Sequence, residues 1–384
     1  MKAKSIHGNT TEEVRQALRE AMSDGFAPTL AIAFVSIKQD REAICQVLRQ
    51  AEIDVLGCTS SGEFTNQAQT SEAAAILLFE LDRDCYTILF EQLDLEDPAA
   101  GATRLAEVAR DRFERPALIL CTTSFTRDGE YLNGQAIMQA MEQVLGADTA
   151  IYGGMAGDDV TFTGSFVFTA DAHSDAGMVA LVLDESKIAL YGMALSGWNP
   201  VGIERTVTAC DDSWILTVDD QPALNMYLKY LGMEPVGDVD AYEIFKDIGI
   251  YYPLQVRGAG DPVLRTPIMA DKERNAIKLD FGVPEGTRFR FSMPPEFDIV
   301  ENVVEQARKL KHTSDARGEA LLIFSCAGRL NALGPMTGIE NDGLAETWDA
   351  PMAGFFTYGE YGTVNGRQGF HSTTCCWVAI KEKQ

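Results

Sequence analysis

The sequence is poor in the residues that build metal centres. Its 384 residues include 4 His, 4 Trp and 8 Cys, and no two Cys stand in CxxC spacing. This excludes the classical zinc motifs and the CxxCH motif of covalently attached haem. Most of the cysteines, such as Cys45, Cys121 and Cys326, lie in apolar runs, where Cys behaves as a small hydrophobe. The sequence therefore predicts a protein of a reducing compartment, the cytoplasm.

Positive charge is also scarce. Lys and Arg number 32 against 57 Asp and Glu, which gives a net charge of −25. Nucleic acids and anionic membrane surfaces are bound by clustered Lys and Arg, so neither is expected as a partner. No apolar run approaches the ~18 residues that a membrane span needs. Residues 1–9 also lack the apolar core of a signal peptide.

Two Gly-rich stretches match none of the common phosphate-binding loops. Residues 57–62 and 153–157 fit neither the GxxxxGK(S/T) motif nor the GxGxxG motif, and no Lys follows them directly. The sequence thus disfavours a nucleotide-binding fold. The glycines are better explained as places where the backbone lines a pocket.

Three apolar runs close on a Gly that is followed by a carboxylate. They are Asp54–Glu63, Thr149–Asp158 and Pro351–Glu360. An uninterrupted apolar run is typical of a strand that is buried on both faces. The Gly lets the chain turn sharply or approach a ligand closely. Because open α/β sheets bind ligands at strand ends, we predict that the three Gly-acid tips meet around one cleft.

Each of the three runs follows an earlier apolar strand, predicted over 29–36, 117–123 and 319–326. Amphipathic helices and further strands complete each copy, in the same order. The pattern predicts an α/β fold with mixed sheets, built from internally repeated strand–helix–strand units.

The stretch 219–295 interrupts the repeats. It combines short helices, one of them predicted over 239–247, with alternating segments bounded by Gly and Pro, which are typical of antiparallel strands. We interpret it as an α+β segment inserted in the C-terminal half. The predicted domains are 1–215, with two copies of the repeat, and 216–384, with the insert and the third copy.

The three tips supply most of the predicted ligand site. Three glycines would admit the ligand, and three carboxylates would hold an ammonium group or a polarised hydroxyl. These residues are Gly62, Gly157, Gly359, Glu63, Asp158 and Glu360. The alternative interpretation is that the acids cap loops or face water.

Donor groups for the site are predicted from the third copy. Arg329 and Asn331 follow strand 319–326, and Arg is the usual clamp for a carboxylate. With Tyr358 and Glu360, they would complement a zwitterion such as an amino acid. A solvent-exposed loop Arg is the alternative.

Histidine and cysteine leave two further hypotheses open. His371 and His173 hold equivalent places in two copies, and either is a candidate ligand to haem iron. His371 is also a candidate donor to an anionic ligand. Cys58 and Ser61 form a candidate nucleophile patch, although no His lies near them in the sequence to act as the base.

Several of these motifs occur together in one known family. The stretches 57–63, 152–158, 331–334 and 354–360, with Phe370-His371, resemble the FIST family over nearly the whole chain. The resemblance implies an N-terminal and a C-terminal FIST domain that act as sensory modules, with amino acids as the proposed ligands. It also implies signalling partners, histidine kinases or cyclic-dinucleotide enzymes. A subgroup resembles haem-based nitric-oxide sensors.

We therefore expect a cytoplasmic binding protein and not an enzyme. It would bind an amino acid or a similar small metabolite and signal in trans, to a histidine kinase or a cyclic-dinucleotide enzyme. A haem-based nitric-oxide sensor is the first alternative, and a hydrolase that uses Cys58 or Ser61 is the second. A homodimer is compatible with each of these hypotheses.

Overall fold

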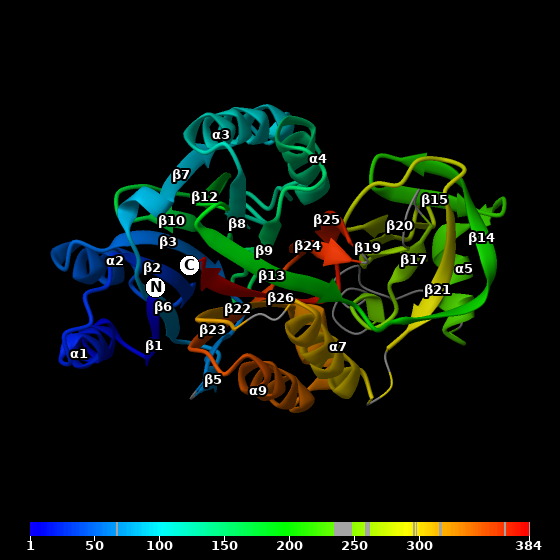
Figure 1. Ribbon diagram of the computed structural model, residues 1–384. Coiled ribbons are helices and arrows are strands. Elements are labelled where there is room, and N and C mark those ends of the chain that lie inside the picture. The colour runs from blue at the N-terminus through cyan, green and yellow to red at the C-terminus, as the bar shows by residue number, and fades with distance from the viewer. Residues whose placement is uncertain are drawn as a thin grey trace.

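The structure is a computed structural model, shown in Figure 1. It describes residues 1–66, 68–233, 248–257, 262–294, 296, 298–314, 317–364 and 366–383. The helix expected over 239–247 lies outside the described residues.

The chain passes three times through one order of elements: strand, helix, strand, helical connection, parallel strand, short hairpin and return strand. The first unit contains β1 (Lys2–Gly8), α1 (Thr11–Met22), β2 (Leu30–Ser36), α2 (Arg41–Gln50), β3 (Asp54–Ser60), β4 (Glu63–Thr65), β5 (Gln69–Thr70) and β6 (Ala74–Glu80). After the short turn η1 (Arg83–Cys85), the second contains β7 (Tyr86–Gln92), α3 (Pro98–Arg112), β8 (Pro116–Thr122), α4 (Gly134–Leu145), β9 (Ile151–Met155), β10 (Val167–Thr169), β11 (His173–Ser174) and β12 (Gly177–Asp184). The third contains β13 (Ile188–Leu195), α7 (Ile299–Thr313), β22 (Ala320–Cys326), α8 (Ala327–Leu333), α9 (Met336–Trp348), β23 (Met352–Thr357), β24 (Glu360–Val364), β25 (Arg367–His371) and β26 (Cys375–Glu382).

The first two units begin their helices with side chains that cap the free backbone N–H groups. Thr10, Asp40, Asp97 and Asn133 each accept a hydrogen bond from the backbone N–H three residues ahead. Such caps typically stabilise a helix by about 1 kcal/mol each. The polar residues at the ends of the apolar stripes therefore fix where α1 to α4 start.

Strand order is the same in the three units: β1-β6-β2-β3, β7-β12-β8-β9 and β13-β26-β22-β23. The neighbours β2 and β3, β8 and β9, and β22 and β23 run parallel, and the other pairs are antiparallel. Each unit then lends its hairpin to another unit. Hairpin β4–β5 extends the sheet of β23, β10–β11 extends that of β3, and β24–β25 extends that of β9. The three units are thereby linked in a closed cycle.

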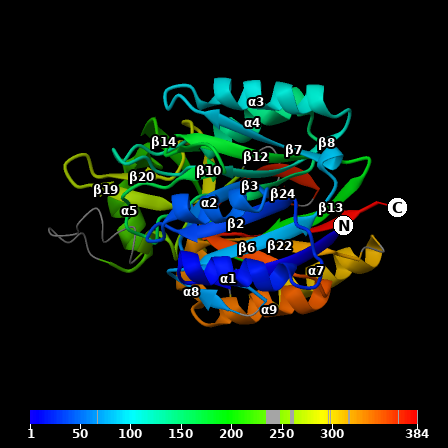
Figure 2. The ribbon, with the colours of Figure 1, turned by 90° about the vertical axis from the view of Figure 1, so that its left-hand side faces the viewer.

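Both faces of each six-stranded sheet are covered. The inner faces pack together in one central core, to which β2 contributes Leu30, Ile32 and Phe34. The outer faces pack against α1 and α2, α3 and α4, or α7 and α9, as Figures 1 and 2 show. Alternate residues of one strand therefore enter two different cores. This explains why the strands are uninterrupted apolar runs.

The inserted segment lies at one end of the three-unit body (Figure 1). It contains β14 (Asn199–Asp211), β15 (Trp214–Val218), β16 (Gln221–Pro222), α5 (Ala223–Tyr230), β17 (Leu254–Val256), β18 (Val263–Arg265), β19 (Pro267–Asp271), β20 (Ala276–Leu279) and β21 (Arg288–Met293). The described strands form one eight-stranded antiparallel sheet with its own apolar core. This sheet also includes β14 and β15, which precede residue 219.

The predicted fold class is confirmed: the chain forms an α/β fold with mixed sheets, repeated units and an inserted α+β segment. In the described part of the chain, no helix combines the length and the apolar character that crossing a membrane requires.

Candidate functional site

The three Gly-acid tips are the points where the chain leaves one sheet and enters another. Each lies between the second parallel strand of a unit and the hairpin that joins a different sheet. Backbone hydrogen bonds join the tips in pairs: Ser61 N to Phe356 O (3.0 Å), Met155 N to Gly359 O (2.8 Å) and Gly157 N to Thr59 O (2.9 Å). The tips of all three units are therefore in direct contact.

The tip glycines allow this contact because side chains would not fit. A Cβ on Gly157 would lie 2.3 Å from Ser61 Oγ and 2.7 Å from Ser61 N. Gly62 has a φ of +112°, a conformation that side chains strongly disfavour. A Cβ on Gly359 would lie 2.3 Å from the ring of Phe370. The nearest neighbours of these glycines are thus other parts of the protein.

We expect the substitution Gly157→Ala to lower the free energy of unfolding by about 1–3 kcal/mol, the usual cost of overpacking. The backbone of Ser61 cannot move without disturbing the joined tips. Chemical denaturation measures the change. Gly338→Ala in α9 is the control, because its Cβ would have no neighbour closer than 3.7 Å. Equal stability of the two variants would show that the tip of the second unit can move away from Ser61 without a cost in stability.

Two of the tip carboxylates are buried and hydrogen-bonded within the protein. Glu63 accepts hydrogen bonds from the Ser60 hydroxyl and from Ala73 N (3.1 Å). Glu360 accepts them from the Thr357 hydroxyl and from Thr374 N (3.0 Å). Each acid thus ties its tip to the start of the return strand of its own unit. Burial raises the pKa of both carboxyls to about 7.

Asp158 has a different role in the fold. Its Oδ2 accepts hydrogen bonds from the backbone N–H of Thr163 (2.6 Å) and Gly164 (3.3 Å), and its Oδ1 accepts one from the Tyr358 hydroxyl (2.7 Å). It therefore organises the loop between β9 and β10. The β9–β10 loop separates Asp158 from its hairpin, which begins at Val167. Glu63 and Glu360, in contrast, are the first residues of their hairpins.

Strand register identifies the true counterpart of the two glutamates. In each hairpin an aromatic residue pairs with a Gly on the neighbouring strand: Phe64 with Gly354, Tyr361 with Gly153, and Phe168 with Gly57. The residue before the aromatic is Glu63, Glu360 or Val167. The second unit thus has an apolar residue where the other two have a carboxylate.

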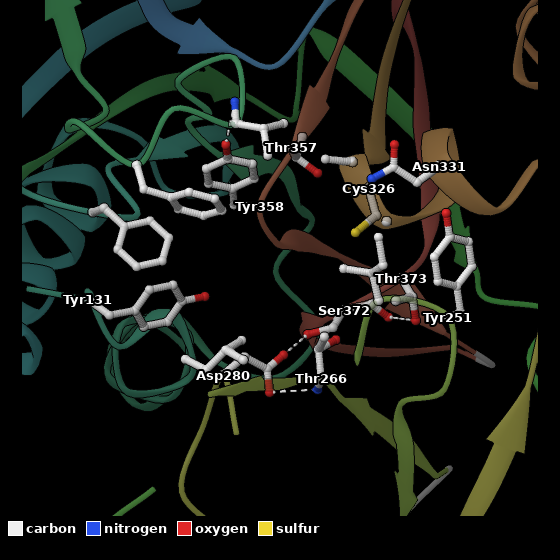
Figure 3. A pocket seen from close by; sticks show the side chains of 17 residues that line it. Tyr131, Tyr251, Thr266, Asp280, Cys326, Asn331, Thr357, Tyr358, Ser372 and Thr373 are labelled. Carbon is white, nitrogen blue, oxygen red and sulfur yellow. Dashed lines mark hydrogen bonds between the residues drawn. The ribbon is translucent and has the colours of Figure 1, made fainter. Parts of the chain in front are cut away.

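A cavity of about 390 Å³, here called the Tyr358 cavity, lies beside the tips at the ends of β22 and β23. Its apolar lining includes Phe125, Tyr131, Phe162, Ile250, Tyr251, Ile268 and Tyr358. Its polar lining includes Thr266, Asp280, Asn331, Thr357, Ser372 and Thr373. These residues come from the second unit, the third unit and the inserted segment (Figure 3).

Asp280 is the carboxylate of this cavity. It directly follows β20, and its Oδ1 accepts hydrogen bonds from Thr266 N (2.9 Å) and Phe281 N (3.0 Å). Its Oδ2 accepts one from Ser372 Oγ (2.6 Å). Burial raises the pKa of Asp280 to about 6, while the charge of Arg265 and these hydrogen bonds lower it.

Among the predicted site residues, Asn331 and Tyr358 line the Tyr358 cavity. Arg329 instead is fully buried beside α9, where its guanidinium donates to the carboxylate of Glu340 and to the carbonyl of Ser196 (2.5 Å). The guanidinium is therefore already occupied by a carboxylate of the protein. Asp280 was not predicted as a site residue, because the sequence does not show that the inserted segment packs beside the tips.

Neither of the two candidate haem-ligand histidines lines the Tyr358 cavity. His371 donates from Nε2 to the carbonyl of Gly362 (3.1 Å), and burial lowers its pKa to about 4. His173 is exposed and lines a separate polar cleft of about 330 Å³ together with Arg41 and Arg49. Among the described residues, no group of three His, Cys, Asp or Glu is placed to hold a metal ion.

Neither candidate nucleophile is among the residues that line the cavity. Cys58 is fully buried in the central core, and burial raises the pKa of its thiol. Ser61 is buried at its tip, in contact with Gly157. A buried thiol with a raised pKa is a poor nucleophile, so the geometry does not favour a hydrolase.

Family models match almost the whole chain, the FIST N domain over residues 29–221 and the FIST C domain over residues 223–363. The chain belongs to the FIST family. FIST domains are sensory, signal-transduction domains, and this FIST protein contains one of each type.

Relatives of this FIST protein extend over its length. An uncharacterised protein of Mycobacterium bovis and one of Mycobacterium tuberculosis are each 24% identical to it, over 95% of this chain and 95% of theirs. A further uncharacterised protein of M. tuberculosis is 28% identical over 46% of this chain and 47% of its own length. A crystal structure of cyanuric acid hydrolase from A. caulinodans aligns with 100% of this chain and 99% of that one, with 9% identity and a TM-score of 0.38.

Proposed function

We propose that this FIST protein senses a small metabolite, an amino acid or a similar compound, that binds in the Tyr358 cavity. The observation that carries the proposal is the cavity itself. Its volume of about 390 Å³ lies within the range of roughly 300–1,000 Å³ that is typical of small-molecule sites. Its lining, aromatic with a few converging polar groups, is also typical of such sites.

The position of the cavity supports a sensory role. Its walls belong to two repeat units and to the inserted segment, so a bound ligand would contact all three. Tyr358 also links the wall to the β9–β10 loop, since its hydroxyl donates to Asp158 and accepts from Val160 N (2.9 Å). A ligand that moves Tyr358 would therefore alter this loop. A partner in trans, a histidine kinase or a cyclic-dinucleotide enzyme, would then distinguish the two conformations of this loop.

Isothermal titration of the purified protein against the twenty amino acids tests the proposal. We expect saturable binding of at least one of them to the wild type. The substitution Gly328→Leu should weaken this binding about tenfold or more, or by at least ~1.4 kcal/mol. A Cβ at Gly328 has Cys326, Thr373 and Ile250 as its nearest neighbours, all of which line the cavity.

Gly338→Leu is the matched control, because this glycine lies in α9 and its Cβ would have only the Gln69 side-chain oxygen within 4 Å, at 3.7 Å. The control should bind like the wild type. Equal binding by Gly328→Leu would place the ligand outside the Tyr358 cavity. If the whole panel gives no heat and no thermal shift, the amino-acid version of the proposal is wrong.

A further inference from the structure

We infer that the ligand of the Tyr358 cavity is recognised through a cationic amine. The Asp280 carboxylate and a wall of aromatic rings would bind this amine jointly. This inference rests on the proposed function and specifies the chemical class of its ligand. It predicts that an amine without a carboxylate binds at least as well as the corresponding amino acid.

Asp280 presents a buried carboxylate to the cavity. It is only 9% exposed, and its three hydrogen-bond donors, Thr266 N, Phe281 N and Ser372 Oγ, are all neutral. Within the described ranges, no ion pair includes this carboxylate. A buried charge is costly unless it is paired, and the side of Asp280 that faces the cavity is where a counter-charge can enter (Figure 3).

The Arg265 guanidinium, whose charge acts on Asp280, is already engaged. Arg265 favours the ionised form of Asp280 through its charge, but its guanidinium donates to Leu264 O (3.0 Å) and Gln135 Oε1 (3.2 Å). It also lies 5.2 Å from the ring centroid of Phe281. Arg265 thus helps to keep Asp280 charged without neutralising it directly. A ligand ammonium would complete the pair.

The aromatic wall is formed by Phe125, Tyr131, Phe162 and Tyr358. Phe125 lies at the centre, with its ring centroid 4.8 Å from that of Tyr131 and 5.5 Å from that of Phe162. Phe162 stacks on Tyr358 at 6.0 Å. Aromatic faces attract cations and repel anions. Burial and then the charge of Asp280 raise the pKa of Tyr131, so the carboxylate acts on the ring at this end of the wall. Both side chains line the cavity (Figure 3).

An amino acid also carries a carboxylate. Among the described lining residues there is no Lys or Arg to bind it. Arg329, the clamp expected from the sequence, is paired with Glu340. Along the described part of the lining, a ligand carboxylate would find hydroxyl, amide and backbone donors, in a cavity that already holds the negative charge of Asp280. The cavity therefore favours a cation over a zwitterion and a zwitterion over an anion.

Three probes that share a phenylethyl group test the preference for a cation over a zwitterion and an anion. They are 2-phenylethylamine, phenylalanine and 3-phenylpropionate. Isothermal titration should show binding of the amine and little or none of the propionate. The substitution Asp280→Asn should weaken amine binding by at least ~30-fold, as expected for loss of a buried charge partner. Asn can keep the bonds from the two backbone N–H groups, so the variant should still fold, which circular dichroism and thermal melting check.

Two further variants sharpen the test. Asp342→Asn removes an exposed carboxylate on α9 and should leave all three titrations unchanged. Phe125→Leu removes the central ring and should weaken amine binding about two- to fivefold. It should not weaken any binding of the propionate, because an aromatic face repels an anion.

The outcomes separate this inference from the proposed function. Binding of phenylalanine or 3-phenylpropionate that Asp280→Asn does not weaken would overturn the amine inference and leave the cavity as a sensor site. Failure of all three probes would overturn the amine inference as well. If other members of the amino-acid panel still bind and Gly328→Leu weakens them, the proposed function survives.

Discussion

The substitution Arg329→Met is expected to lower the free energy of unfolding by about 3–5 kcal/mol, the usual cost of breaking a buried ion pair. Arg329 and Glu340 are both fully buried, and their side chains form an ion pair between α8 and α9. Methionine fills a similar volume but leaves the Glu340 carboxylate without its counter-charge. Urea denaturation monitored by circular dichroism measures the loss.

A second variant isolates the charge from the packing. Adding Glu340→Gln to Arg329→Met removes the unpaired charge, and we expect it to recover most of the lost stability. The control is Lys309→Met, which breaks the exposed pair with Glu305 on α7 and should cost at most about 0.5 kcal/mol. A stable Arg329→Met protein with weakened ligand binding would instead support the clamp role that the sequence suggested.

The sequence did not reveal that Arg329 is paired inside the protein, and this has a physical cause. A sequence shows that an Arg follows a strand end, but not which carboxylate it meets. Here the carboxylate is Glu340, on a helix with too weak an apolar stripe to reveal which face is buried. The counterpart of a buried charge is set by tertiary packing, and one sequence does not contain that information.

The sheets could be predicted because their strands are buried on both faces. Runs such as Leu30–Ser36 and Ala320–Cys326 contribute to the central core and to an outer core at once, and their composition reflects this directly. The three repeats were recognised for the same reason. The strands predicted over 29–36, 117–123 and 319–326 are β2, β8 and β22 of the structure, whereas β1 and hairpin strands such as β24 were not predicted.

The exchange of hairpins could not be predicted in this way. Strand β4 has three residues, and it pairs with β23, which lies about three quarters of the chain length away. Short strands have little periodicity, and a pairing over such a distance leaves no local pattern. The same exchange explains the tip glycines, which the sequence showed as possible ligand contacts. They are needed where the chain passes from one sheet to another.

The candidate site was predicted only at its edge. Tyr358 and Asn331 belong to the third unit and were found because they stand next to recognisable strand ends. Asp280 and Phe125 come from the inserted segment and from a loop of the second unit. Nothing in the sequence brings these two segments together, because the cavity forms only when the insert packs against the repeats.

At alkaline pH the wild-type protein, with Glu63 and Glu360 at the tips, should be less stable than a variant with glutamine at either position. Burial raises the pKa of Glu63 and of Glu360 from 4.5 to about 7. The folded protein therefore binds these protons more tightly than the unfolded chain does. Their contribution to stability is complete below pH 4.5 and is lost as the pH rises to about 7. A shift of this size corresponds to about 3 kcal/mol at each site.

Either Glu63→Gln or Glu360→Gln mimics the protonated acid, since Gln can donate to the neighbouring hydroxyl and accept from the backbone N–H of Ala73 or Thr374. At pH 8 we expect each variant to be more stable than the wild type by up to about 3 kcal/mol, with the difference disappearing near pH 4.5. Denaturation curves from pH 4.5 to 9 measure it, with the exposed Glu346→Gln as control. A glutamine variant less stable than the wild type at pH 8 would mean that the pKa of the two carboxyls is not raised in the folded protein. Their hydrogen bonds would then outweigh the cost of burying the charge, and the tips would be held together by anions.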